Sequence, residues 1–276
     1  MKRYLTSLCI AAVCAYGEER FIHFTTQTLD FDGSKQKRSG MRYATHFGYK
    51  TSHYRIDALY DFTRTQTYQP PLPNDLYVRK YFLRYRYRYN DAWQWGASAG
   101  IVDDNLAKET DGGRIWGIFG IYRNWQLHQY ISDYRRFNVY QSDIRYVHKT
   151  HFRHIPMIIA VQGSYIHLQH RKSNAFSAGA KPDYLNASAS VRIPYGNWYT
   201  SAGAYIGKRM FSVMNDGLGV QHHAMEFDRT AMIAVGRHRK NTEVVVKYIY
   251  MRAKEVPIAN PNVDIHTVTL GIGIHF

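Results

Sequence analysis

The sequence predicts an all-β protein, a single antiparallel β-barrel that crosses a membrane with about fourteen strands. Apolar and polar side chains alternate over segments of roughly ten to thirteen residues, and the connections between these segments alternate between short and long. No run of about 18 apolar residues follows the N-terminal region, which excludes membrane helices. The mean hydropathy of −0.45 fits a barrel, because only alternate residues of each strand face lipid.

The clearest alternation lies between residues 77 and 89. Because successive strand residues point to opposite faces, one face is aromatic and the other is cationic. The apolar row of residues 93–101 follows the same period. We expect five aromatic side chains of these two segments to face the membrane, namely Tyr81, Tyr85, Tyr87, Trp93 and Trp95.

The remaining segments repeat this alternation at 53–64, 157–165, 185–193 and 244–250. Short connections fall near residues 50–52, 90–91, 124–125, 195–197 and 239–241, and long polar ones near 65–76, 102–113, 170–182, 209–226 and 254–264. Counting segments between them gives about fourteen strands. Twelve is the alternative, because the pair around residues 126–150 has only a short external connection near Asn138.

The N-terminus has the layout of a secretory signal peptide. Lys2 and Arg3 precede an apolar stretch from Leu5 to Val13, which is too short for a lasting membrane helix, and Ala15 offers a cleavage site. We therefore expect residues 1–15 to be removed and residues 16–276 to form one barrel domain. The mature chain would have no cysteine and a net charge of +13, from 34 Lys and Arg against 21 Asp and Glu.

The C-terminal segment is an alternating apolar row that ends on an aromatic residue, with Val268, Leu270, Ile272, Ile274 and Phe276. In this feature, and in its 24 tyrosines, the sequence resembles the outer-membrane β-barrel proteins of Gram-negative bacteria, including porins. The resemblance implies a place in the bacterial outer membrane, among its lipid and lipopolysaccharide. It also implies that Phe276 is the signal read by the barrel-assembly machinery. It points to no specific family.

The polar faces predict a charged lumen. A hairpin that closes near residues 65–76 would place acids of residues 53–64 beside the basic row of residues 77–89. We expect the lumen to be lined by Arg84, Arg86, Arg88, Lys80, Arg55, Asp57 and Asp61. Such a wall favours passive diffusion of small anionic solutes, since charged pore walls set selectivity. The alternative is a plugged structural or adhesive barrel, in which these side chains form a salt-bridge ladder.

Other functions are less favoured. A lipid hydrolase of the outer membrane would place a His two residues before a Ser, and none of the 14 histidines has a Ser there. The groups His148, His151, His154 and His222, His223 lack the spacing and the further ligands of a metal site, so we expect neither metal nor cofactor. Alternation of Tyr with Arg separates the two types on opposite faces, which argues against a nucleic-acid platform.

Overall fold

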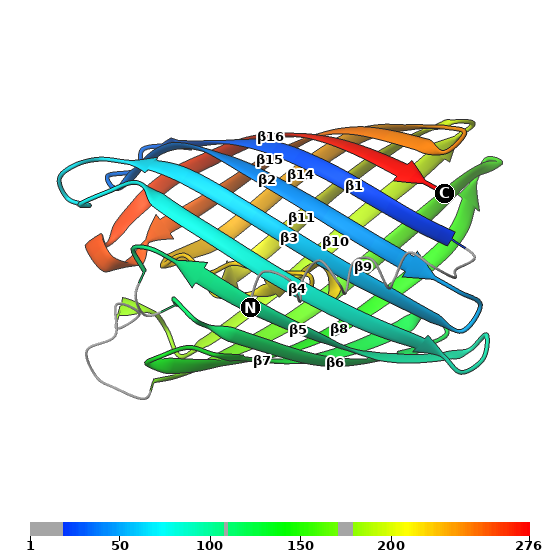
Figure 1. The fold of residues 1–276 in the computed structure, drawn as a ribbon, viewed down its shortest axis with the longest axis horizontal. Helices are drawn as coiled ribbons and strands as arrows, with labels where there is room; N and C mark the ends of the chain where they lie inside the picture. Colours follow the sequence, from blue (N-terminus) through cyan, green and yellow to red (C-terminus); the bar gives the residue numbers. More distant parts are fainter. Residues whose placement is uncertain (1–18, 108–109, 171–178) are drawn as a thin grey trace, which may run out of the picture.

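The computed structural model describes residues 19–107, 110–170 and 179–276 (Figure 1). The predicted signal peptide and its cleavage site lie outside these residues. Most of the described chain is β-strand. The first seven strands are β1 (Glu19–Asp32), β2 (Lys37–Lys50), β3 (Tyr54–Thr67), β4 (Leu76–Arg88), β5 (Trp93–Asp104), β6 (Arg114–Tyr122) and β7 (Trp125–Asp133).

The second half of the chain continues in the same way. Its barrel strands are β8 (Phe137–Phe152), β9 (Ile155–His170), β10 (Asp183–Tyr195), β11 (Trp198–Arg209), β14 (Met225–Arg239), β15 (Thr242–Glu255) and β16 (Asn260–His275). The shorter elements are β12 (Val213–Met214), the 3₁₀ turn η2 (Asn215–Gly217), β13 (Gly219–Val220) and the 3₁₀ turn η3 (Val256–Ile258).

The fourteen long strands form one closed antiparallel barrel, in which β1 pairs with β16 (Figure 1). This confirms the predicted fold and excludes the twelve-strand alternative. The two strands that were hardest to assign are β7 and β8, and residues 134–136 connect them. No helix in the described parts of the chain is long and apolar enough to cross a membrane.

The connections divide the barrel into two ends. The segments 51–53, 89–92, 123–124, 153–154, 196–197 and 240–241 lie at one end, which we call the short-turn end. β1 begins and β16 ends there as well (Figure 1). The other end, here the loop end, carries all remaining connections, including the longest ones. Connections at the short-turn end have at most four residues, but three at the loop end, 33–36, 134–136 and 256–259, are as short. The predicted alternation of lengths therefore holds only in part, and the long connection predicted near 254–264 is wrong.

The two faces of each strand differ in chemistry. Over residues 81–87 of β4 and 93–101 of β5 the outward row is apolar and aromatic. Tyr81, Tyr85, Trp93 and Trp95 are exposed, and Tyr87 packs against Trp95. The inward row includes Phe82 and Val102, which are 4% and 0% exposed. A continuous apolar outer surface is what contact with lipid requires.

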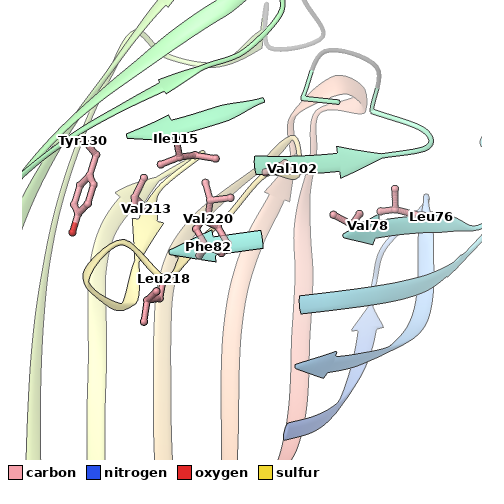
Figure 2. Packing of buried hydrophobic residues seen from close by; sticks show 9 residues of the cluster. All are labelled: Leu76, Val78, Phe82, Val102, Ile115, Tyr130, Val213, Leu218 and Val220. Atoms are coloured by element: carbon pink, nitrogen blue, oxygen red, sulfur yellow. The ribbon is translucent and has the colours of Figure 1, made fainter. Parts of the chain in front are cut away.

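The connection between β11 and β14, residues 210–224, folds into the barrel. The sequence predicts a long polar external loop near residues 209–226, and this prediction is wrong. Instead Val213, Leu218 and Val220 pack against inward side chains of β4 to β7, including Phe82 and Tyr130 (Figure 2). The physical reason is its apolar content, because these side chains lose contact with water only inside the barrel.

Candidate functional site in the barrel lumen

The predicted acids and bases of β3 and β4 meet as cross-strand pairs. Asp57 lies opposite Arg84, and Asp61 lies opposite Lys80. The distance from Arg84 Nη2 to Asp57 Oδ2 is 2.8 Å, and that from Lys80 Nζ to Asp61 Oδ2 is 3.4 Å. Both carboxylates are almost fully buried, at 0% and 1% exposure. Buried carboxylates need such partners, because an unpaired buried charge is strongly destabilising.

Each of these acids has more than one basic partner. Arg55 Nη2 lies 2.8 Å from Asp57 Oδ1, and His46 Nε2 lies 3.0 Å from the same oxygen. Arg42 Nη2 lies 2.6 Å from Asp61 Oδ2. Much of the predicted basic lining is therefore held in ion pairs within the wall itself.

The three arginines of β4 have different surroundings. Arg84 is buried among its partners. The guanidinium of Arg86 lies 5.6 Å from the ring centre of Phe119, and its Nε has no hydrogen-bond partner among the described residues. Arg88 lies at the short-turn rim, where its Nη2 contacts Asp91 Oδ1 at 2.6 Å and both side chains are exposed. The three do not form one continuous cationic row.

Asp216, at the tip of the inward-folded loop, joins two of the wall arginines. Its carboxylate lies 3.1 Å from Arg145 Nη1 and 3.7 Å from Arg84 Nη1. Burial raises the pKa of Asp216, but the neighbouring Arg145, His128 and Arg84 outweigh burial, and the net pKa lies below its ordinary value. Asp216 is therefore a carboxylate at neutral pH.

The backbone of this loop is held by a side chain of the wall. The amide of Gln141 on β8 donates a hydrogen bond to the Val213 carbonyl at 2.9 Å and accepts one from the Val213 N–H at 2.7 Å. Asn215 and Asp216 adopt left-handed backbone angles, with φ of 54° and 53°. Such angles cost energy in residues other than glycine, so the contacts of the docked loop must offset that cost.

A cavity of about 400 Å³ remains in the lumen beside the loop. The loop forms one wall, and inward side chains of β8 to β11 form much of the other. Most of the lining is polar. Its charged side chains are Arg84, Arg145, Arg209, Asp143 and Asp216.

Several residues of this site were not singled out in the sequence, among them Gln141, Arg145, Arg209 and Asp216. A signal for the loop was present, because residues 210–220 contain Met210, Phe211, Val213 and Leu218, which is unusual for an external loop. No comparable signal marked Gln141 or Arg145. Their role depends on a contact with a segment that lies far away in the chain.

The histidine groups considered in the sequence lie apart from the cavity. His148 and His151 lie toward the short-turn end of β8, and His154 lies in the turn that follows. His222 and His223 lie in residues 210–224 with ring centres 4.1 Å apart. Burial and the nearby Lys80 and Lys37 hold the pKa of His222 well below its ordinary value.

Comparison with known proteins identifies a fold and no family. No family model matches the sequence, and no curated protein matches it. Among solved structures, a bacterial polysaccharide outer membrane secretin is 8% identical, with 93% of this chain and 98% of that chain covered and a TM-score of 0.57.

Two further structures are similar. A FadL homologue of Pseudomonas aeruginosa is 7% identical, with 94% of this chain and 90% of that chain covered and a TM-score of 0.57. The toluene transporter TbuX of Ralstonia pickettii is 11% identical, with 94% and 90% covered and a TM-score of 0.55. At these identities the likeness concerns the fold alone. The chain has the fold of the bacterial outer-membrane β-barrel proteins.

Proposed function

We propose that this protein is a channel of the bacterial outer membrane for passive diffusion of small anionic solutes, closed at its loop end by residues 210–224. It is exported with a cleaved signal peptide and inserted by the barrel-assembly machinery through Phe276. The observation that carries this proposal is the polar lumenal cavity of about 400 Å³ with Arg84, Arg145 and Arg209 in its lining. No bond-breaking chemistry is part of the proposal.

The charge of the cavity lining favours anionic solutes over cationic ones. Its lining contains three arginines against Asp143 and Asp216, and a guanidinium stays charged at any physiological pH. When the loop leaves the lumen, Asp216 leaves with it, and Arg145 and one side of Arg84 lose their partner. The open path is therefore more positive than the closed one. One structural neighbour is named as a toluene transporter, but a lining of this polarity suits charged solutes better than a hydrocarbon.

The loop is built for reversible docking. Among the described residues, the polar anchors of its central part, residues 213–220, are at Gln141, Arg84 and Arg145. The apolar side chains of this part pack in the first apolar cluster, whereas Met210 and Phe211 before it pack in a second one. Its two ends are already adjacent, since the Gln221 N–H donates a hydrogen bond to the Ser212 carbonyl at 2.9 Å. Residues 213–220 thus form a finger that enters the lumen from a closed base.

A loop-shortened variant tests the proposal. Residues 213–220 are replaced by Asn-Gly, a pair that closes two-residue hairpins, so that Ser212 and Gln221 keep their hydrogen bond. In planar bilayers, we expect the variant to spend a much larger fraction of time in a conducting state than the parent protein. We also expect its reversal potential across a salt gradient to report anion preference in dilute salt.

A second candidate function is a plugged structural barrel, and a specific observation favours it. Three apolar clusters occupy the loop end of the lumen, and several of their side chains have no solvent exposure. If the loop-shortened variant is folded and inserted but does not conduct, the structural barrel replaces the channel. If it conducts with cation preference, the channel stands and the anionic substrate class is wrong.

A further inference from the structure

Three metal-ligating side chains converge inside the barrel at its short-turn end. They are His23 on β1, Glu243 on β15 and His275 on β16. One ligand atom from each lies within 4.8 Å of the other two, and all three side chains are partly buried. These strands meet at the seam where the first and last strands close the barrel. None of the three lines the cavity that carries the proposed function, and none lies in residues 210–224.

The register of the seam builds the cluster. Glu243 lies opposite Gly273, and Gly273 lies opposite His23, so the three positions form one row across β15, β16 and β1. A Cβ atom at position 273 would lie 2.6 Å from His23 Nε2. The imidazole thus uses the space that a glycine leaves, and its Nε2 reaches to 3.9 Å from Glu243 Oε2. His275 is the next inward residue along β16, with its ring centre 5.3 Å from that of His23.

The two imidazoles each have an unused nitrogen. His23 Nε2 and His275 Nε2 are enclosed, and neither has a hydrogen-bond partner among the described residues. The separation of 3.9 Å from His23 Nε2 to Glu243 is too long for a hydrogen bond. Enclosed polar nitrogens are ordinarily paired, so two of them in one cluster with a carboxylate point to a shared ligand.

The carboxylate is held so that one oxygen stays available. The Tyr199 hydroxyl donates a hydrogen bond to Glu243 Oε1 at 2.7 Å, and His238 Nε2 lies 3.3 Å from the same oxygen. Glu243 Oε2 is the oxygen that faces His23. Fixing a ligand carboxylate through its second oxygen is the usual support around protein metal sites.

We propose that His23, Glu243 and His275 bind one divalent transition-metal ion of the zinc class. Two imidazoles with one carboxylate suit zinc and its neighbours, whereas magnesium and calcium prefer oxygen ligands alone. Ligand atoms about 2.1 Å from a tetrahedral zinc ion lie about 3.4 Å apart. The observed spread of up to 4.8 Å requires the side chains to close by no more than about 1.5 Å. A fourth position is left for water.

Binding at this place would tie the seam of the barrel. The ligands come from both ends of the chain, and the ion would link β1 directly to β15 and β16. An ion that binds only the closed barrel raises its stability with increasing concentration. This inference does not depend on whether solutes pass through the lumen, because a metal ion at the seam would stabilise an open channel and a plugged barrel alike.

Zinc titration of the intact barrel tests this inference. Untagged protein in detergent is treated with a chelator and titrated with zinc sulfate by calorimetry, beside the variants His23→Gln and His275→Gln. We expect one zinc ion per barrel in the parent protein. We expect each variant to lose more than about 100-fold in affinity, because loss of a supporting residue alone costs about 10- to 100-fold. Zinc should raise the unfolding temperature of the parent protein and not of the variants.

His266→Gln is the matched control, since His266 also lies on β16 but bonds to the Tyr248 hydroxyl, with 2.7 Å between Nδ1 and the oxygen. It should bind zinc like the parent protein. Gly273→Ala should weaken binding, because the new Cβ displaces the His23 ring. If His275→Gln fails to fold, His23→Gln on the other strand still decides the matter. Stoichiometric zinc binding that neither His variant weakens overturns the proposal, and so does absence of zinc binding by the parent protein.

Discussion

The loop end of the lumen is packed by three apolar clusters, with a few buried charged side chains such as Lys37 and Glu255, whereas the short-turn end is lined by charged and imidazole side chains around a partly open space. Val78 on β4 and Val263 on β16 have no solvent exposure at the loop end. Toward the short-turn end, by contrast, the Arg145 side chain remains 30% exposed and Glu243 13% exposed. The same barrel wall thus changes character along its axis.

Under the proposed channel function, this difference would separate two tasks. Apolar packing at the loop end would exclude water and solutes and so determine whether a path exists. Charged groups farther in would act on the solutes that enter and so determine which of them pass. The loop of residues 210–224 spans both regions. Leu218 belongs to the apolar cluster (Figure 2), and Asp216 belongs to the ionic one. Substitutions at these neighbouring positions should therefore have different consequences.

The largest effect is expected from Leu218→Asp. Leu218 is 5% exposed in the first apolar cluster, and an unpaired carboxylate there costs about 3 kcal/mol or more. The equilibrium between docked and released loop should shift toward release by about 100-fold or more, because each 1.4 kcal/mol of free energy changes an equilibrium constant tenfold. Single-channel recording should then show frequent opening.

Ile258→Asp is the control for that substitution, because Ile258 is 40% exposed in the connection that contains η3, also at the loop end. Ile258→Asp should open as rarely as the parent protein. Frequent opening in both variants would mean that added negative charge, and not release of the loop, opens the path. A Leu218→Asp barrel that is folded and stays closed would show that the loop is not the barrier.

A smaller effect is expected from Asp216→Asn, which removes the ionic anchor and keeps the apolar one. Hydrogen bonds to charged groups contribute about 1.5–3 kcal/mol, and partial exposure of this pair reduces that to about 1–2 kcal/mol. Opening should rise roughly tenfold. Anion preference should increase as well, because Arg84 and Arg145 lose a negative partner.

Acidification should imitate this substitution in the parent protein. The pKa of Asp216 is lowered in the docked loop, so its contribution is fully present above the ordinary carboxyl pKa of about 3.9 and is lost as pH falls through the lowered value. Opening should therefore increase below about pH 4, and Asp216→Asn should abolish that increase. Asp91→Asn, at the exposed rim, should respond to acid like the parent protein. If acid opens Asp216→Asn as much as the parent protein, a group other than Asp216 is responsible for the pH dependence.

The period-two pattern predicted the barrel because it reports a local property. Whether Tyr85 or Arg84 faces outward follows from strand geometry and the cost of placing charge against lipid. The facing pairs Asp57–Arg84 and Asp61–Lys80 were also within reach, since one hairpin joins their strands. Neighbouring strands with a known turn have a defined register.

Contacts between distant segments could not be predicted in this way. Nothing local pairs Gln141 with Val213, because that contact exists only when residues 210–224 turn inward. His23 and His275 lie at opposite ends of the chain and meet only when the barrel closes. The spacing of residues identifies sites within a strand or a hairpin, and it has no access to sites at the seam.

The smallest effect is expected from substitutions of two arginines of β4. It shows which part of the charged lumen determines ion selectivity. In the loop-shortened background, Arg86→Gln and Arg88→Gln each remove one positive charge from the same strand face. Arg86 lies within the lumen without an acidic hydrogen-bond partner among the described residues, whereas Arg88 is exposed and paired with Asp91. Exposed charges are screened over about 10 Å in 0.1 M salt, so Arg88 should contribute little to the electric field inside the lumen.

We expect Arg86→Gln to reduce anion preference measurably in dilute salt and Arg88→Gln to leave the reversal potential unchanged. Equal shifts from both would move the selective region to the short-turn mouth, and the ionic cluster around Arg84 would then serve only to hold the loop.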